Sequence, residues 1–240
     1  MITPSTPNDM NKKKRGVDMN KIVISSCIAC MAMVLSPQTA FSQGTVYLTS
    51  LGQASIGSAA VASDSWQAES FFTGKNPGGY VLDSVQLEMT PASGAPDDFT
   101  VMLYTDVGIN GPIPGTSLGT LIGSTDPSAS GLYTYTADSL ELAPDTSYFI
   151  VVTAGTASSA GAYAWSVENT SSTTSPSGGW GWVSTLSSSS DGSYWPFSSD
   201  TVPQFDLTAT AIPEPETLYL MSLPGVLFFV WRRWHTKAQA

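Results

Sequence analysis

Short stretches in which apolar and polar residues alternate fill the chain between residues 43 and 211. The alternation is clear at residues 85–89, and it recurs at 99–103 and 205–209. A period of two places alternate side chains on opposite faces of a strand, so each stretch predicts a strand with one buried face. No long amphipathic helical pattern occurs between these strands, and this constrains the fold to β structure.

Residues 147–155 differ because they are apolar without interruption through Val152. Such a run is typical of a central strand that is covered on both faces. Further strands are predicted from apolar and β-branched residues at 46–49, 67–72, 118–122, 132–136 and 162–167.

Turn-forming sequence rich in Gly, Pro, Asp and Ser separates these strands at short intervals. Many short strands with such turns favour an all-β fold, and we expect an antiparallel β-sandwich of jelly-roll type. Residues 43–211 are enough for one such domain. The turns begin at Gly74, Pro91, Asp106, Ser124 and Leu142.

The first 42 residues are typical of a cleaved signal peptide. Lys21 precedes a short apolar run at 22–35, and Ala40 and Ser42 have the spacing of the small residues before a signal-peptidase cut. We expect cleavage after Ser42, with Met19 as a possible alternative start. The only cysteines, Cys27 and Cys30, lie in this run, so the exported domain would contain no disulfide.

A second apolar run, at 218–231, is followed by Arg232 and Arg233. Its 14 residues fall short of the roughly 20 that an untilted transmembrane helix needs. We expect a short transmembrane helix that inserts transiently, with the two arginines on the cytoplasmic side as a stop. Everything between the two apolar runs would then be exported.

Residues 212–240 resemble the PEP-CTERM sorting tail of bacteria. Pro213-Glu214-Pro215, the apolar run and Arg232-Arg233 occur in the order of that tail. The resemblance implies processing by an exosortase, a membrane-embedded cysteine transpeptidase of Gram-negative bacteria that make exopolysaccharide. The alternative is a plain C-terminal membrane anchor.

Residues 45–210 resemble the choice-of-anchor R domain in their running pattern. The resemblance is carried by "DSWQAESFFTG" from Asp64, "YVLDSVQLEM" from Tyr80 and "YTYTADSLELAPDTSYFIVVTAG" from Tyr133, among other segments. It implies an exported domain that is joined to a sorting tail, and it supplies no catalytic residues.

The domain is strongly acidic. Between residues 43 and 212 there are 15 Asp and Glu residues, and Lys75 is the one basic residue. Such a surface repels polyphosphate, so nucleic acid is not expected as a partner. No cofactor is expected, although acidic loops such as Asp97-Asp98 could bind calcium weakly.

Motifs that suggest catalysis lack their partners. "GTSLG" at 115–119 matches a nucleophile-elbow pattern, but the only histidine, His235, lies beyond the apolar tail and cannot activate Ser117. "DVGING", which begins at Asp106, resembles the start of a calcium loop, yet a hairpin turn explains it better.

Glycosidase chemistry needs paired carboxylates. We expect the domain's glutamates to be solvated at surface or strand-edge positions, namely Glu69, Glu88, Glu141 and Glu168.

Aromatic residues gather at 180–197. Trp180 and Trp182 are two residues apart and would share one face of an extended strand, and Trp195 follows closely. They either stack on sugar rings at the surface or fill the core between two sheets, where large aromatic side chains bury substantial area.

Taken together, these patterns predict an exported cell-surface or extracellular-matrix protein without catalytic activity. Its expected partners are a signal peptidase and an exosortase during processing, and exopolysaccharide afterwards. The alternative function is a carbohydrate-binding module that uses the Trp180 and Trp182 region, and a hydrolase is the third hypothesis.

Overall fold

A computed structural model describes residues 44–108, 111–123, 125–169, 178–182, 186–199 and 201–214. These residues form strands and loops and no helix, and none of them could cross a membrane as a long apolar helix. The fold is therefore all-β, as the sequence predicts. The strands are β1 (Thr45–Thr49), β2 (Gly57–Val61), β3 (Trp66–Phe72), β4 (Tyr80–Gly94), β5 (Thr100–Asp106), β6 (Pro114–Gly123), β7 (Gly131–Leu142), β8 (Ser147–Thr153), β9 (Gly161–Asn169), β10 (Gly181–Trp182), β11 (Ser187–Ser189), β12 (Phe197–Ser198), β13 (Thr201–Pro203) and β14 (Phe205–Ala211).

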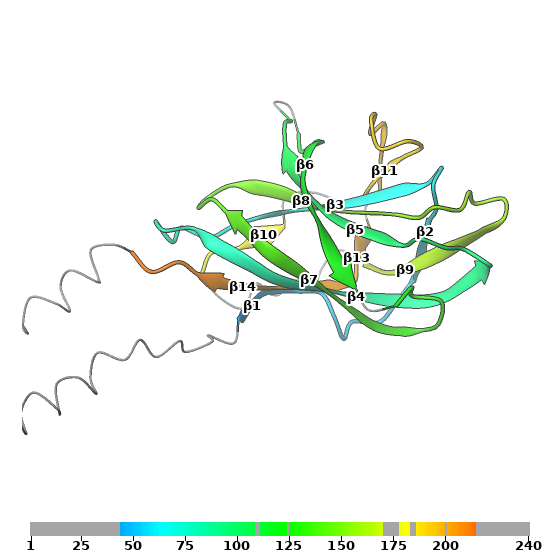
Figure 1. Cartoon of the computed structure of the whole chain (residues 1–240), viewed down its shortest axis with the longest axis horizontal. Helices are drawn as coiled ribbons and strands as arrows, with labels where there is room; N and C mark the ends of the chain where they lie inside the picture. The colour runs from blue at the N-terminus through cyan, green and yellow to red at the C-terminus, as the bar shows by residue number, and fades with distance from the viewer. Residues whose placement is uncertain are drawn as a thin grey trace, which may run out of the picture. The chain divides into compact units, whose positions relative to one another are not determined.

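The strands form an antiparallel sheet that folds back on itself into two layers and nearly closes (Figure 1). One layer has the order β1-β14-β4-β7, and β9, β2 and β13 extend it beside the second half of β4. The other layer has the order β3-β8-β5-β6, and β10, β11 and β12 lie beyond β3. Strand β6 joins the layers, because its last two residues, Ile122 and Gly123, pair with β7.

The hydrophobic core lies between the layers. Its largest fully buried members include Trp165, Tyr163, Phe71 and Phe205. Strand β8 is central, as predicted, and lies between β3 and β5. Its inner residues belong to this core, whereas Phe149 and Val151 belong to a smaller outer patch on the opposite face. Both faces are covered, which agrees with its uninterrupted apolar run from Tyr148 to Val152.

A bulge in β4 explains why its apolar residues change from even to odd numbers. Tyr80 and Leu82 are buried, and after a register shift in the pairing with β14, between Leu82 and Ser84, the buried residues are Val85, Leu87 and Met89. The extra residue, Asp83, accepts a hydrogen bond of 2.8 Å from the Thr210 hydroxyl. The bulge thus keeps the buried residues on both sides of it on the core side of this long strand.

All nine predicted strands are present, but two are much longer than predicted: 85–89 is the centre of β4, and 132–136 is the first half of β7. Five short strands were not predicted: β2, β10, β11, β12 and β13. Four of them have only two or three residues, which is too short to show an alternation.

Candidate functional site

The C-terminal tail leaves the domain at a defined point. The Ile212 N–H donates to the Gly79 carbonyl at 3.0 Å, and the Asn76 side-chain amide donates to the Ile212 carbonyl at 2.9 Å. Pro213, the first residue after this clamp, is exposed, and Glu214 is half-buried. The predicted sorting motif therefore begins immediately after the last residue that the sheet holds.

The remaining predicted processing residues lie outside the described residues. These are Pro215, the apolar run at 218–231, Arg232 and Arg233 at the C-terminal side, and Met19, Ala40 and Ser42 at the N-terminal side.

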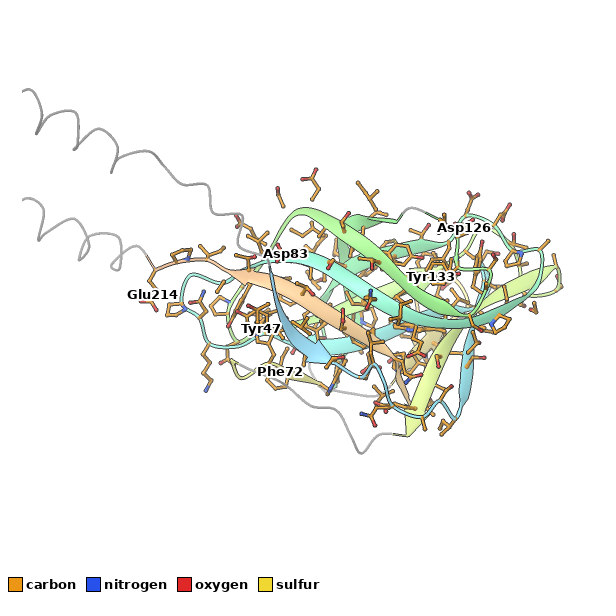
Figure 2. All side chains as sticks on the ribbon, turned by 90° about the horizontal axis from the view of Figure 1, so that it is seen from below. Tyr47, Phe72, Asp83, Asp126, Tyr133 and Glu214 are labelled. Atoms are coloured by element: carbon orange, nitrogen blue, oxygen red, sulfur yellow. The ribbon has the colours of Figure 1, made fainter. Side chains whose placement is uncertain are left out.

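Both ends of the described domain emerge at the same side of the sheet. Strand β1 pairs antiparallel with β14, and Thr45 lies opposite Ala209. The start of β1 is therefore beside the end of β14, where Glu214 follows (Figure 2). Any attachment through either end would hold the domain from this side.

Trp180 lies in the core and not on the surface. It is 2% exposed, and its ring stacks against Tyr47 and Phe71 with centroid distances of 4.7 and 5.9 Å. The edge of Tyr80 completes the cluster at 4.9 Å. The interpretation of Trp180 as a sugar-stacking surface is therefore wrong, since surrounding aromatic rings cover it, and the alternative interpretation as a core residue holds.

Trp182 and Trp195 are half-buried and lie on different faces of the layer that contains β3. Trp182 packs edge-on against Phe205 of the central core at 4.6 Å. Trp195 packs instead on the outer patch, which comprises Ala68, Met102, Phe149 and Val151. The indole N–H groups of all three tryptophans are buried without a hydrogen-bond partner. The three rings thus do not form one shared platform.

Ser117 lies in the middle of β6 opposite Tyr104, with its side chain exposed. A nucleophile elbow requires a sharp turn between a strand and a helix. Ser117 has no such geometry. In the loop after β5, Asp106 accepts hydrogen bonds from the backbone N–H groups of Gly108 and Ile113 at 2.8 and 3.0 Å, as a turn-forming residue does.

Two acidic residues in loops accept hydrogen bonds from the loop between β8 and β9. The Asp97 carboxylate accepts a hydrogen bond from the Thr156 hydroxyl. Asp64 accepts from the Ser158 N–H at 2.8 Å and from its hydroxyl at 3.0 Å, and these bonds lower the pKa of Asp64. Within the described ranges, no three Asp, Glu, His or Cys side chains come together as metal ligands.

Two glutamates that the sequence placed at the surface are buried, and that prediction is wrong. Glu69 in β3 is fully buried, Glu168 in β9 is 2% exposed, and burial raises the pKa of both carboxyl groups. Neither Glu69 oxygen has a hydrogen-bond partner. Glu69 shares its face of β3 with Phe71, which belongs to the central core. The sequence signal was its position in an otherwise largely apolar strand, "WQAESFF".

A cavity of about 170 Å³ opens where β6 passes from one layer to the other. Its wall is formed by the consecutive strands β5, β6 and β7 and by the loop between β6 and β7. The sequence did not identify it, because the cavity exists only where β6 leaves β5 to pair with β7. The wall includes Phe99, Thr100, Thr120, Thr125, Asp126 and Tyr135.

We compared the chain with protein-family models, with curated proteins and with solved structures, and found no match in any of the three. The family resemblances described above therefore rest on the quoted residues alone.

Proposed function

We propose that this chain is an exported cell-surface or extracellular-matrix protein without catalytic activity, and that an exosortase processes its C-terminal tail. The observation that carries the proposal is the position of the sorting motif. Pro213-Glu214-Pro215 follows directly after the clamp at Ile212, and Pro213 is exposed. A membrane enzyme could therefore reach the motif without unfolding any strand.

A non-catalytic role is proposed because the residues that suggested chemistry lack the required setting. Ser117 lies within a strand, and the sequence contains no histidine or cysteine between residues 43 and 211. The strong excess of acidic residues suits solubility outside the cell.

We also propose that the sandwich is of the jelly-roll type. The order β1-β14-β4-β7 faces the order β3-β8-β5-β6, and the chain alternates between the layers as it passes through β3, β4 and β5. Eight strands in two layers with these orders support two interleaved Greek keys.

The sorting proposal is tested by expressing the full chain in a host that has an exosortase and in the same host without it. Mass spectrometry of the surface protein should show loss of the C-terminal arginines only when the enzyme is present. Glu214→Ala should abolish this processing, whereas the matched variant Glu141→Ala, which changes an exposed glutamate on β7, should be processed normally. Equal processing of both variants would contradict a role for the motif.

The alternative function, polysaccharide binding through the Trp180 and Trp182 region, is not favoured, because Trp180 is buried and Trp182 packs on the core. If the domain binds sugar, the site lies elsewhere.

A further inference from the structure

The connection between β3 and β4 holds the point at which the C-terminal tail leaves the sheet. Asn76, Pro77, Gly78 and Gly79 form a tight turn there, closed by a hydrogen bond of 2.8 Å from the Gly79 N–H to the Asn76 carbonyl. Asparagine and proline are favoured at the first two positions of such a turn. The turn is also anchored to the core, because the Asn76 N–H donates to the hydroxyl of the buried Tyr80 at 3.2 Å.

Ile212 is held by this turn through both of its backbone polar groups. Its N–H donates to the Gly79 carbonyl at 3.0 Å, and its carbonyl accepts from the Asn76 side-chain amide at 2.9 Å. Gly78 lies against the same carbonyl, because a Cβ atom on Gly78 would be 2.4 Å from the Ile212 oxygen. Any larger residue at position 78 would therefore push Ile212 away from the turn.

Only a short stretch of chain separates this clamp from the predicted membrane segment. Residues 213–217 lie between Ile212 and the apolar run that begins at Leu218. These five residues span at most about 18 Å when fully extended. Pro213 and Pro215 favour an extended backbone around them. With the apolar run inserted in the membrane, as we propose, the sorting motif is tethered at both of its ends.

A tether that is fixed at both ends presents the motif in few conformations. Each residue that a binding partner must order costs conformational entropy. A segment that is already held extended has lost part of this entropy before it binds. Releasing Ile212 from the turn would return freedom to the end of β14 and slacken the tether. The clamp thus lowers the cost of bringing Glu214 into the binding site of an enzyme.

We propose that Asn76 is a positioning residue for the processing of the tail. It acts through Ile212 and keeps the sorting motif taut between the sheet and the membrane, and Gly78 supports the same clamp. The proposal rests on the proposed function, because it requires a membrane enzyme that recognises the motif.

Three variants of the full chain test the proposal in cells that contain an exosortase. Asn76→Asp keeps a turn-forming side chain but replaces the amide donor by a carboxylate, which repels the Ile212 carbonyl. Gly78→Ala places a methyl group against that carbonyl. The third variant carries a Gly-Ser-Gly insertion between Ile212 and Pro213, which leaves the clamp intact and lengthens the tether. Each variant should slow removal of the tail about threefold to tenfold in a pulse-chase experiment.

The matched control is Gly57→Ala, which should be processed as the parent is. Gly57 is exposed, and the nearest atom to an added Cβ would be 4.0 Å away. Amide hydrogen exchange of the purified chain in detergent then reports on the clamp itself. The Ile212 N–H should exchange faster in Asn76→Asp and Gly78→Ala, and at the parent's rate in the insertion variant. The insertion variant should also keep the parent's unfolding midpoint, so its slower processing cannot come from a weakened fold.

Several results would overturn the proposal. One is processing of the insertion variant at or above the parent's rate. Another is such processing of Asn76→Asp while its Ile212 N–H exchanges faster. A third is an Ile212 N–H that already exchanges freely in the parent. If the parent itself is not processed, the sorting proposal fails and this one fails with it, whereas equal processing of the parent and all three variants overturns this one alone.

Discussion

The Trp180 indole stacks on the phenol ring of Tyr47, with centroids 4.7 Å apart and planes inclined by 16°. Phe71 stacks parallel to the same indole, with an interplanar angle of 1°. The stack joins β1, β3 and the segment before β10, which are remote in sequence. It lies near the end where the tail leaves, because the Tyr80 hydroxyl, in the same cluster, accepts a hydrogen bond from the Asn76 N–H.

Trp180→Ala should therefore destabilise the domain by about 3–5 kcal/mol, the usual cost of removing a buried large aromatic side chain. Chemical denaturation followed by circular dichroism measures the change. Tyr194→Ala is the control, because Tyr194 is 71% exposed and should change the free energy of unfolding by less than about 0.5 kcal/mol. Similar stabilities of the two variants would show that Trp180 is not a core residue.

Gln204 connects three segments where β13 passes into β14. Its side-chain amide donates to the Gln53 carbonyl at 2.8 Å, its side-chain oxygen accepts from the Ser166 hydroxyl, and its backbone carbonyl accepts from the Trp165 indole. Gln204→Ala should lower the free energy of unfolding by about 1–3 kcal/mol, because it leaves buried partners unpaired.

The control for Gln204 is Gln86→Ala, which removes an exposed hydrogen bond to Thr134. Urea denaturation should show a change of less than about 0.5 kcal/mol for this control. If Gln204→Ala changes the free energy of unfolding as little as this control does, the hydrogen bonds of Gln204 contribute little to stability.

Glu69 should make stability depend on pH. Its pKa in the fold is raised well above the ordinary 4.5 by burial. As pH rises above 4.5, the unfolded chain loses this proton while the folded chain keeps it, so stability falls until the folded pKa is passed. Glu69→Gln should remove this fall and give a more stable protein at pH 7, as measured by urea denaturation at pH 5 and pH 7.

The matched control for Glu69 is Glu141→Gln, on an exposed position of β7, which should retain the pH dependence. Glu69→Leu provides a second neutral variant, in case the buried amide is itself costly. If both Glu69 variants keep the slope of the parent protein, the carboxyl group is not buried in solution.

Asp206 should also make the stability depend on pH, but over a narrower pH range than Glu69. Burial raises its pKa to about 6, against the opposing effect of a hydrogen bond from the Gln86 backbone. Its contribution to stability should therefore decline as pH rises from about 4 to about 6. Asp206→Asn should make the thermal unfolding midpoint depend less on pH across this range, whereas the control Asp138→Asn should not. An unchanged pH dependence in Asp206→Asn would argue against the raised pKa.

The strands were predictable from sequence wherever one face of the sheet was covered. Residues 85–89 and 205–209 alternate because their outer faces remain partly accessible, and both stretches lie in the strands expected. The bulge at Asp83 was not predictable, because it depends on pairing with β14 and β7, which are distant in the chain.

The position of Glu69 was mispredicted for a related reason. In β3 the residues from Gln67 to Phe71 are all buried, because the outer face is covered by Trp195 and its neighbours as well. A polar residue in such a strand no longer indicates the solvent side. Trp180 was ambiguous in the same way, since its neighbours Tyr47, Phe71 and Tyr80 are brought to it by the tertiary fold.

The central claim is that the chain is exported and then processed at both ends. The most direct measurement is the intact mass of the surface protein from cells that contain an exosortase. We predict that the mature protein begins at Gln43 and lacks Arg232 and Arg233. A surface protein that retains Arg232-Arg233 at its end would contradict the account.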